Sequence, residues 1–249
     1  MIIFRVKRLT LAELESSTCT TLTVLLTLSV VHVEDSSSAS VNLFTLKMII
    51  QELKQTLSGV YEITPETGSA FFLRTTYLTF VPEERLCIHE TFTDEETADI
   101  LNAALIYSTE VVAMSYLSRA EQCRYSLTSK LLKKGLQKNA IEPALDYLES
   151  VHYLDDNRFA GAWLRNRAID HVEGRLRLSA ELAGRGIDRL IARKALDEFF
   201  STHDEHELCR IALNKCIRQK KSEDKIYASL QRSGFSIKEI RSVLNEQKQ

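Results

Sequence analysis

The chain has 249 residues, of which 44% are hydrophobic and 27% charged, so it has the side chains for a sizeable core and is not a disordered chain. Only eight glycines and three prolines interrupt it, which favours long helices over a β protein with many turns. Residues 1–107 carry 7 basic and 14 acidic residues, whereas residues 108–249 carry 25 and 20, a balance of +5. This excess is compatible with contacts to phosphate or to an acidic protein, but it is too small to establish either.

The most apolar run, Thr20–Val33, is shorter than the roughly 20 residues that a membrane-spanning helix needs. Its alternation of apolar and polar residues predicts a half-buried strand, and the polar run Glu34–Ser40 predicts a linker. Residues 1–40 are therefore expected to form a separate extension. Met48 opens a stretch that is itself a plausible start of the protein, so an over-long gene model is an alternative.

The next region, residues 41–107, has the mixed pattern of a small α+β region. Val60–Ile63 and Ala70–Leu73 flank a segment with Pro65 and Gly68, which predicts a hairpin. Leu86–His89 is a further candidate strand. After it, the residues from Thr93 to Glu96 are expected to cap a helix with acidic residues in its first turn.

The second half of the chain repeats itself with a period of about fifty residues, aligned on Gly135, Gly186 and Gly234. Apolar residues one turn apart precede each glycine, and residues spaced i, i+3, i+4 follow it, so each glycine is expected to join two amphipathic helices. Glycine can take the left-handed conformation that ends a helix. The aligned columns are Leu127, Leu178 and Ile226; Leu131, Leu182 and Leu230; Leu136, Ile187 and Phe235; Ile141, Ala192 and Ile240; Ala144, Ala195 and Val243; and Leu145, Leu196 and Leu244.

A further helical pattern precedes each pair of helices, so each repeat is predicted to be a three-helix unit. Because one unit buries little by itself, successive units should stack on a continuous core. The predicted fold class is mainly α: tandem three-helix repeats forming an elongated helical array, preceded by a small α+β N-terminal region. The predicted units cover residues 108–155, 156–202 and 203–249.

The segment Tyr153-Leu154-Asp155-Asp156 joins two helical patterns. Asp155 is expected to cap the second helix, and Arg158 in its first turn is close enough to pair with an acidic neighbour. Phe159 and Trp163 lie one turn apart on one face, where core packing is the favoured interpretation and an interface anchor is the alternative.

No catalytic motif is present: the sequence has no GxGxxG, GxxxxGK[ST] or GxSxG, and the paired aspartates are explained by capping. The five cysteines are scattered without a CxxC, so a reducing cytoplasm fits better than a disulfide framework. His203, His206 and Cys209 drift around a helix without a fourth ligand. We therefore expect no enzyme activity, no cofactor and no metal.

Three stretches carry a resemblance to a known family. SLTSKLLKKG, YLDDNRFAGAWLRNR and LSAELAGRGI, in this order, resemble the signatures of the RecX family of recombination regulators. The resemblance covers residues 61–244. It implies a cytoplasmic, non-enzymatic protein that binds the RecA recombinase filament on single-stranded DNA, with weaker contact to DNA. We also expect the protein to be a monomer. The chain departs from the family pattern at residues 170–174, which family members have more basic and richer in glycine.

Eight basic residues are candidates for a protein or DNA interface, although each taken singly is more simply a solvated residue or an ion-pair partner. Two further functions stay open beside the filament regulator: a helical module whose main ligand is DNA, and a helical adaptor for another partner. Salt dependence separates the filament regulator from the DNA-binding module, because contacts to phosphate weaken steeply with salt. The candidates are Lys133, Lys134, Arg158, Arg165, Arg167, Arg175, Arg177 and Arg185.

Overall fold

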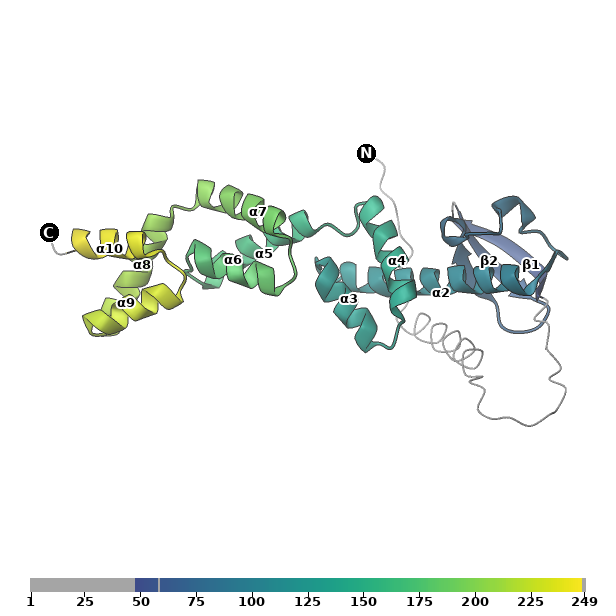
Figure 1. The fold of residues 1–249 in the computed structure, drawn as a ribbon, viewed down its shortest axis with the longest axis horizontal. Helices are drawn as coiled ribbons and strands as arrows, with labels where there is room; N and C mark the ends of the chain where they lie inside the picture. The colour runs from purple at the N-terminus through teal and green to yellow at the C-terminus, as the bar shows by residue number, and fades with distance from the viewer. Residues whose placement is uncertain (1–47, 58, 248–249) are drawn as a thin grey trace, which may run out of the picture. The chain divides into compact units, whose positions relative to one another are not determined.

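The computed structural model describes residues 48–57 and 59–247, which form a small sheet followed by a series of helices (Figure 1). The strand and linker predicted within residues 20–40 lie outside the described residues. The chain divides into two compact units, and the boundary between Thr109 and Glu110 falls inside a long helix. The predicted fold class is confirmed: the protein is mainly helical, with tandem helical units after a small region that contains strands.

The N-terminal one of these two compact units is built on a four-stranded antiparallel sheet with the strand order β3-β2-β1-β4. The predicted hairpin is confirmed, because it joins β2 to β3 and Gly68 in its turn has a φ of +115°. Ile50, Ile63 and Leu73 are fully buried and form part of the core. The strands are β1 (Met48–Leu57), β2 (Val60–Pro65), β3 (Phe71–Arg74) and β4 (Thr91–Phe92).

The strand predicted at Leu86–His89 is wrong. These residues turn after a short 3-10 helix, and the N–H of Cys87 donates to the carbonyl of Arg85 (2.9 Å). His89 has a φ of +66°, which reverses the chain where a strand would need extended backbone. The sheet instead gains β4, which pairs with the start of β1.

Helix α2 (Asp94–Leu117) begins at the predicted capping box. The N–H of Glu96 donates to the Thr93 hydroxyl (3.3 Å), and the N–H of Thr93 donates to the Glu96 carboxylate (2.9 Å). One turn later the buried Asp99 accepts hydrogen bonds from the consecutive N–H groups of Thr79–Val81. This carboxylate fixes the preceding loop to the helix.

Among the described helices, α2 is the one that is long and apolar enough to cross a membrane by length and composition. However, 39% of its apolar window is buried inside the protein. The helix also carries the buried polar side chains of Asp99, Thr109 and Glu110. Buried polar side chains favour packing of this helix against protein, because such groups are costly in lipid.

Six of the helices after α2 form three pairs, each joined at one of the predicted glycines. Gly135, Gly186 and Gly234 have φ values of +83°, +74° and +86°, which confirms a left-handed helix end at each position. After Gly186 the N–H of Ile187 donates back to the carbonyl of Leu182 (3.2 Å), as this type of helix end requires. The helices are α3 (Arg124–Lys133), α4 (Lys138–Ser150), α5 (Asp156–Asp170), α6 (Arg175–Gly184), α7 (Arg189–Thr202), α8 (Glu205–Arg218), α9 (Glu223–Arg232) and α10 (Ile237–Glu246).

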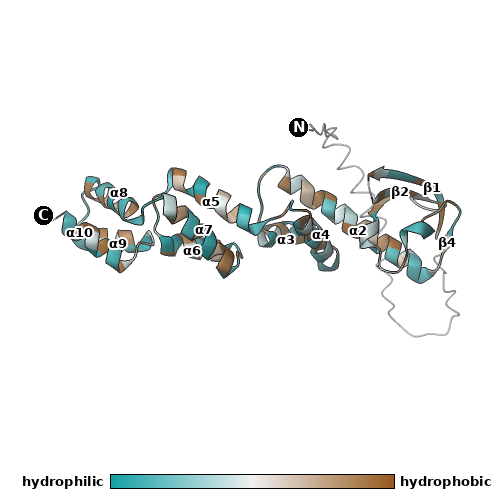
Figure 2. Ribbon diagram, turned by 90° about the horizontal axis from the view of Figure 1, so that it is seen from above, coloured by the Kyte–Doolittle hydropathy of each residue, from teal (hydrophilic) through white to brown (hydrophobic). Residues whose placement is uncertain are grey.

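The aligned apolar columns contribute to the cores of the three-helix units, which are numbered here in chain order. Nearly all of their members are buried, and Leu244 is the partly buried exception. In the second unit this core receives side chains from α5, α6 and α7, and in the third from α8, α9 and α10. Figure 2 shows that the same helices also carry hydrophilic residues, so each has an outward face.

Successive three-helix units are joined by equivalent contacts. The first N–H of α3, from Arg124, donates to the carboxylate of Asp156 at the start of α5 (2.8 Å). The first N–H of α6, from Arg175, donates to the carboxylate of Glu205 at the start of α8 (2.9 Å). In both junctions a carboxylate of the following unit therefore occupies a free helix N-terminus.

Candidate interaction surface

The adjacent carboxylates of Asp155 and Asp156 cap two different helices. Asp155 accepts the N–H groups of Asn157 (2.8 Å) and Arg158 (3.3 Å) at the start of its own helix, α5. Burial opposes ionisation of Asp155, but these hydrogen bonds, together with the Asn157 side chain and the charge of Arg158, outweigh it and lower its pKa. Burial raises the pKa of Asp156, against the hydrogen bond from the N–H of Arg124. Helix capping thus accounts for both carboxylates.

Arg158 closes the turn that precedes α5. Its guanidinium donates to the carbonyls of His152 (2.9 Å) and Tyr153 (2.8 Å) and pairs with Glu121 (2.5 Å). Leu154 lies in the same turn and is buried, whereas the Tyr153 side chain is 55% exposed. The predicted acidic partner of Arg158 therefore exists, and the guanidinium is occupied within the protein.

Phe159 and Trp163 are partly buried and pack against the core of the second unit. The Arg185 guanidinium lies 4.5 Å from the centroid of the Trp163 ring, within the range of a cation–π contact. Arg185 also pairs with Glu181 (2.7 Å), one turn before it in α6. These side chains hold α5 and α6 together.

Arg167 and Arg177 converge on one buried carboxylate. The side chain of Glu173 is 8% exposed and pairs with Arg167 (2.8 Å) and Arg177 (2.7 Å). The hydrogen bond from Arg167 lowers the pKa of Glu173, and the nearby charges of both arginines add to this effect against burial. Glu173 lies within residues 170–174, where the sequence analysis predicts a departure from the family pattern, and it is an internal partner for two of the candidate arginines.

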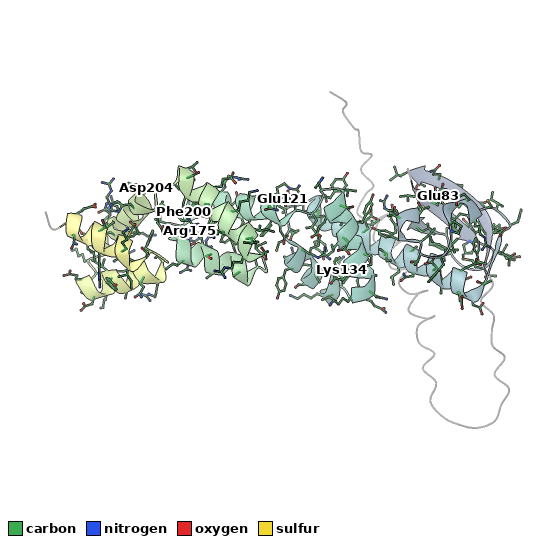
Figure 3. All side chains as sticks on the ribbon, turned by 45° about the horizontal axis from the view of Figure 1, so that its top comes forward. Glu83, Glu121, Lys134, Arg175, Phe200 and Asp204 are labelled. Carbon is green, nitrogen blue, oxygen red and sulfur yellow. The ribbon has the colours of Figure 1, made fainter. Side chains whose placement is uncertain are left out.

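Arg175 lies at the junction between the second and third units. Its guanidinium pairs with Asp197 and is 5.6 Å from the centroid of the Phe200 ring (Figure 3). Arg124 at the preceding junction pairs in the same way with Asp146 (2.7 Å), which lies at the equivalent position of α4. Five of the eight basic candidates, Arg158, Arg167, Arg175, Arg177 and Arg185, are thus held by carboxylates of the protein.

The other three candidates have no carboxylate partner in the part of the chain that the structure describes. Lys133 and Lys134 are exposed at the end of α3, where the Lys134 ammonium is 5.8 Å from the centroid of the Tyr116 ring. Arg165 is exposed on α5 at a pocket of about 220 Å³ whose lining includes the side chain of Phe199. These three cations are available to a partner.

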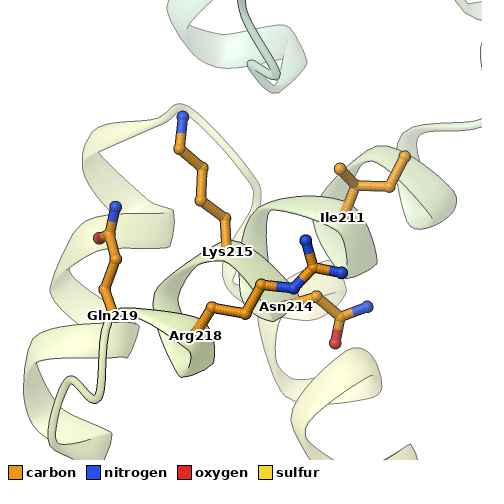
Figure 4. Close-up of a pocket in the computed structure, with 5 residues that line it drawn as sticks. All are labelled: Ile211, Asn214, Lys215, Arg218 and Gln219. Atoms are coloured by element: carbon orange, nitrogen blue, oxygen red, sulfur yellow. The ribbon is translucent and has the colours of Figure 1, made fainter.

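The structure also has a basic surface that the sequence analysis does not single out. Lys215 and Arg218 are exposed on one face of α8, beside an open pocket of about 510 Å³ (Figure 4). Neither forms an ion pair with a described residue. The signal in the sequence is the segment 208–222, which has five basic and no acidic residues. We call the surface formed by the residues that line this pocket the α8 face. These residues are Ile211, Asn214, Lys215, Arg218 and Gln219.

Comparison with known proteins agrees with this architecture. Residues 155–196 match the model of the second three-helix domain of RecX. The regulatory protein RecX of Treponema pallidum (strain Nichols) is 38% identical over 152 residues, which cover 61% of this chain and 93% of that protein. RecX of Pelodictyon phaeoclathratiforme is 32% identical over 138 residues, which cover 53% of this chain and 84% of that protein.

Solved structures show the same fold. A crystal structure of a regulatory protein RecX superposes with a TM-score of 0.66, covers 80% of this chain and 99% of its own, and is 21% identical. RecX from Lactobacillus salivarius gives a TM-score of 0.51 over 57% of this chain and 96% of its own, at 23% identity. The fold defines a mainly helical protein built from tandem three-helix repeats. The chain belongs to the RecX family of regulatory proteins.

Proposed function

We propose that this protein binds the filament that the RecA recombinase forms on single-stranded DNA and inhibits it. The inhibited activities are ATP hydrolysis, strand exchange and the co-protease activity, so the protein acts in recombination, DNA repair and control of the SOS response. It works in the cytoplasm as a monomer and without catalysis. Membership of the RecX family of regulatory proteins supports this proposal.

The observation that carries the proposal is the repetition of the three-helix unit. Equivalent contacts join consecutive units, Arg124 to Asp156 and Arg175 to Glu205, so the units follow one another in a regular way. A filament presents the same subunit surface at regular intervals, and a protein of regular units suits such a partner. Lys133, Lys134 and Arg165, which have no internal carboxylate partner among the described residues, are the proposed contacts to the filament.

The experiment is a measurement of RecA ATP hydrolysis on single-stranded DNA with the purified protein at less than equimolar amounts. We expect slower hydrolysis, because one bound molecule should affect several subunits of the filament. A circular dichroism spectrum establishes that the protein is folded. An unchanged rate at equimolar folded protein would favour the helical adaptor over the regulator.

DNA is a second candidate ligand, and the α8 face is the observation that favours it. Lys215 and Arg218 are exposed cations without a described carboxylate partner, as a contact to phosphate requires. The proposed regulator would use this contact as a weak addition to its protein interface.

A further inference from the structure

The α8 face differs in charge from the equivalent face of the preceding unit. Counted from the capping residues Asp155 and Asp204, the α5 residues equivalent to Lys215 and Arg218 are Asn166 and Ile169. All four side chains are exposed, and in this register the buried Ala160 and Leu164 of α5 align with the buried Cys209 and Leu213 of α8, which supports the comparison. The five residues that line the α8 pocket together carry two positive charges. The five equivalent residues of α5 carry no net charge; they are Ala162, Arg165, Asn166, Ile169 and Asp170.

The end of α8 extends the positive charge. Lys220 and Lys221 follow the helix directly, and no acidic residue occurs between Leu208 and Ser222. Cations in the last turn of a helix also interact favourably with the helix dipole, and this interaction is the simplest explanation of Lys215 and Arg218. Lys220 ends the helix with a φ of +54°, the left-handed conformation that Gly135, Gly186 and Gly234 adopt at other helix ends.

The groups on the α8 face are those that bind a phosphate backbone. Lys215 and Arg218 supply positive charge, and the amides of Asn214 and Gln219 supply further hydrogen-bond donors. Arginine, lysine, asparagine and glutamine are among the side chains that contact phosphate oxygens in protein–DNA complexes. The pocket beside them is open, and Ile211 forms an apolar wall against which a sugar could lie. The lining has no carboxylate to repel phosphate, and because it also has no aromatic residue to stack on a base, contacts to the backbone alone would carry binding.

We propose that the α8 face is a binding site for the phosphate backbone of single-stranded nucleic acid, independent of base sequence. The site rests on the proposed function only for its setting, because the DNA in a recombinase filament is single-stranded. It assigns the DNA contact to the third unit, while the proposed protein contact at Arg165 lies on the second.

The test measures binding of the full chain to a fluorescent oligothymidylate, without recombinase, by anisotropy at several salt concentrations. For Lys215→Glu with Arg218→Glu we expect at least about tenfold weaker binding at low salt. Each phosphate contact of a single strand contributes about 0.7 to the slope of log affinity against log salt, so the slope should fall by about 1.4.

The matched control is Lys238→Glu with Arg241→Glu on α10. These residues are also an exposed lysine and arginine three positions apart in the third unit, and the change in charge is identical. We expect binding within about twofold of the wild type and an unchanged slope. If Lys215→Glu with Arg218→Glu does not fold, Lys215→Gln with Arg218→Gln replaces it and should lower the slope equally.

Equal losses in both double variants would overturn the site, because net charge alone would then explain binding. Undiminished binding after the α8 change would overturn it as well. If the wild type binds a fluorescent polyglutamate but not the oligothymidylate, the α8 face is a site for an acidic protein and the proposal fails. Because no recombinase is present, each result is independent of whether the protein regulates RecA.

Discussion

The first helices of the second and third units, α5 and α8, have the same architecture but different outward faces. Both begin at a capping aspartate, Asp155 and Asp204, and both bury equivalent positions, such as Leu164 and Leu213. On the outside, α5 presents a face without net charge and α8 a positive one. Repetition in this protein therefore fixes the core and the helix ends, whereas the exposed positions are free to differ between units.

The largest expected effect concerns a helix end that the units share. Gly234 and Gly135 both have positive φ, but a Cβ on Gly234 would lie 2.3 Å from the backbone N of Arg177, whereas a Cβ on Gly135 would meet nothing within 4 Å. Gly234→Ala should lower the free energy of unfolding by about 3 kcal/mol or more, because strain and a backbone clash add. Gly135→Ala should cost only about 1 kcal/mol. Chemical denaturation measures both, and equal losses would refute the close junction.

The next effect is specific to the second unit. Glu173→Gln removes the negative charge between Arg167 and Arg177, so we expect a loss of about 2 kcal/mol in unfolding free energy. Glu181→Gln is the control, since its half-exposed pair with Arg185 should contribute at most about 1 kcal/mol. The lowered pKa of Glu173 predicts that its contribution is present above pH 4.5 and is lost as the pH falls through its pKa in the folded protein. Thermal melting of wild type and variant across this acid range would reveal the difference.

A functional prediction sharpens the contrast between the two faces. Arg165→Glu should weaken filament binding by about tenfold, because like charges meet across an interface, and should leave oligothymidylate binding unchanged. The α8 variant should show the reverse preference. Arg189→Glu on α7 is the control for an exposed arginine of the same unit that, like Arg165, pairs with no described carboxylate. Anisotropy with filament and with free oligonucleotide measures both affinities, and parallel changes in the two would remove the division of roles.

Arg175 is unsuitable for such a test. Its guanidinium pairs with Asp197 and its N–H with Glu205, so Arg175→Glu would disturb the junction as well as any interface.

The smallest effect is a dependence of stability on pH in the third unit. His206 at the start of α8 lies 3.0 Å from both Glu239 and Glu246 on α10, and hydrogen bonds with Glu246 and then Glu239 raise its pKa above 6.5. The stabilisation is therefore complete below pH 6.5 and is lost as the pH rises through the pKa of the folded protein. The melting temperature should fall slightly over this range in the wild type. His206→Gln should abolish that fall, and an unchanged profile in the variant would contradict it.

The sequence predicts the features that depend on neighbouring residues. The glycine helix ends and the apolar columns follow from spacing within one helix pair, and the Asp155 cap follows from residues two and three positions away. The boundaries of the three units stay predictions; a soluble, helical circular dichroism spectrum from residues 108–249 expressed alone is the expected outcome of their test.

Features that depend on distant residues could not be predicted in this way. The partners of Arg175, Asp197 and Glu205, are 22 and 30 positions away, so its charge reads as exposed in the sequence although it is used internally. Strand β1 was missed because only its first residues, Met48 and Ile50, show the buried alternation, and most of the strand is exposed. The basic segment of α8 was visible in the sequence. Its significance depends on distant residues, because it lies in the lack of any ion pair between Lys215 or Arg218 and a described carboxylate.

The most direct test of the central claim is the binding of the fluorescently labelled protein to RecA assembled on single-stranded DNA with a non-hydrolysable ATP analogue. Moderate salt suppresses the contact to bare DNA, and free RecA and free DNA serve as the two references. The account predicts saturable binding to the filament that is at least about tenfold tighter than binding to either reference. Binding no tighter to the filament than to bare DNA at the same salt would contradict it.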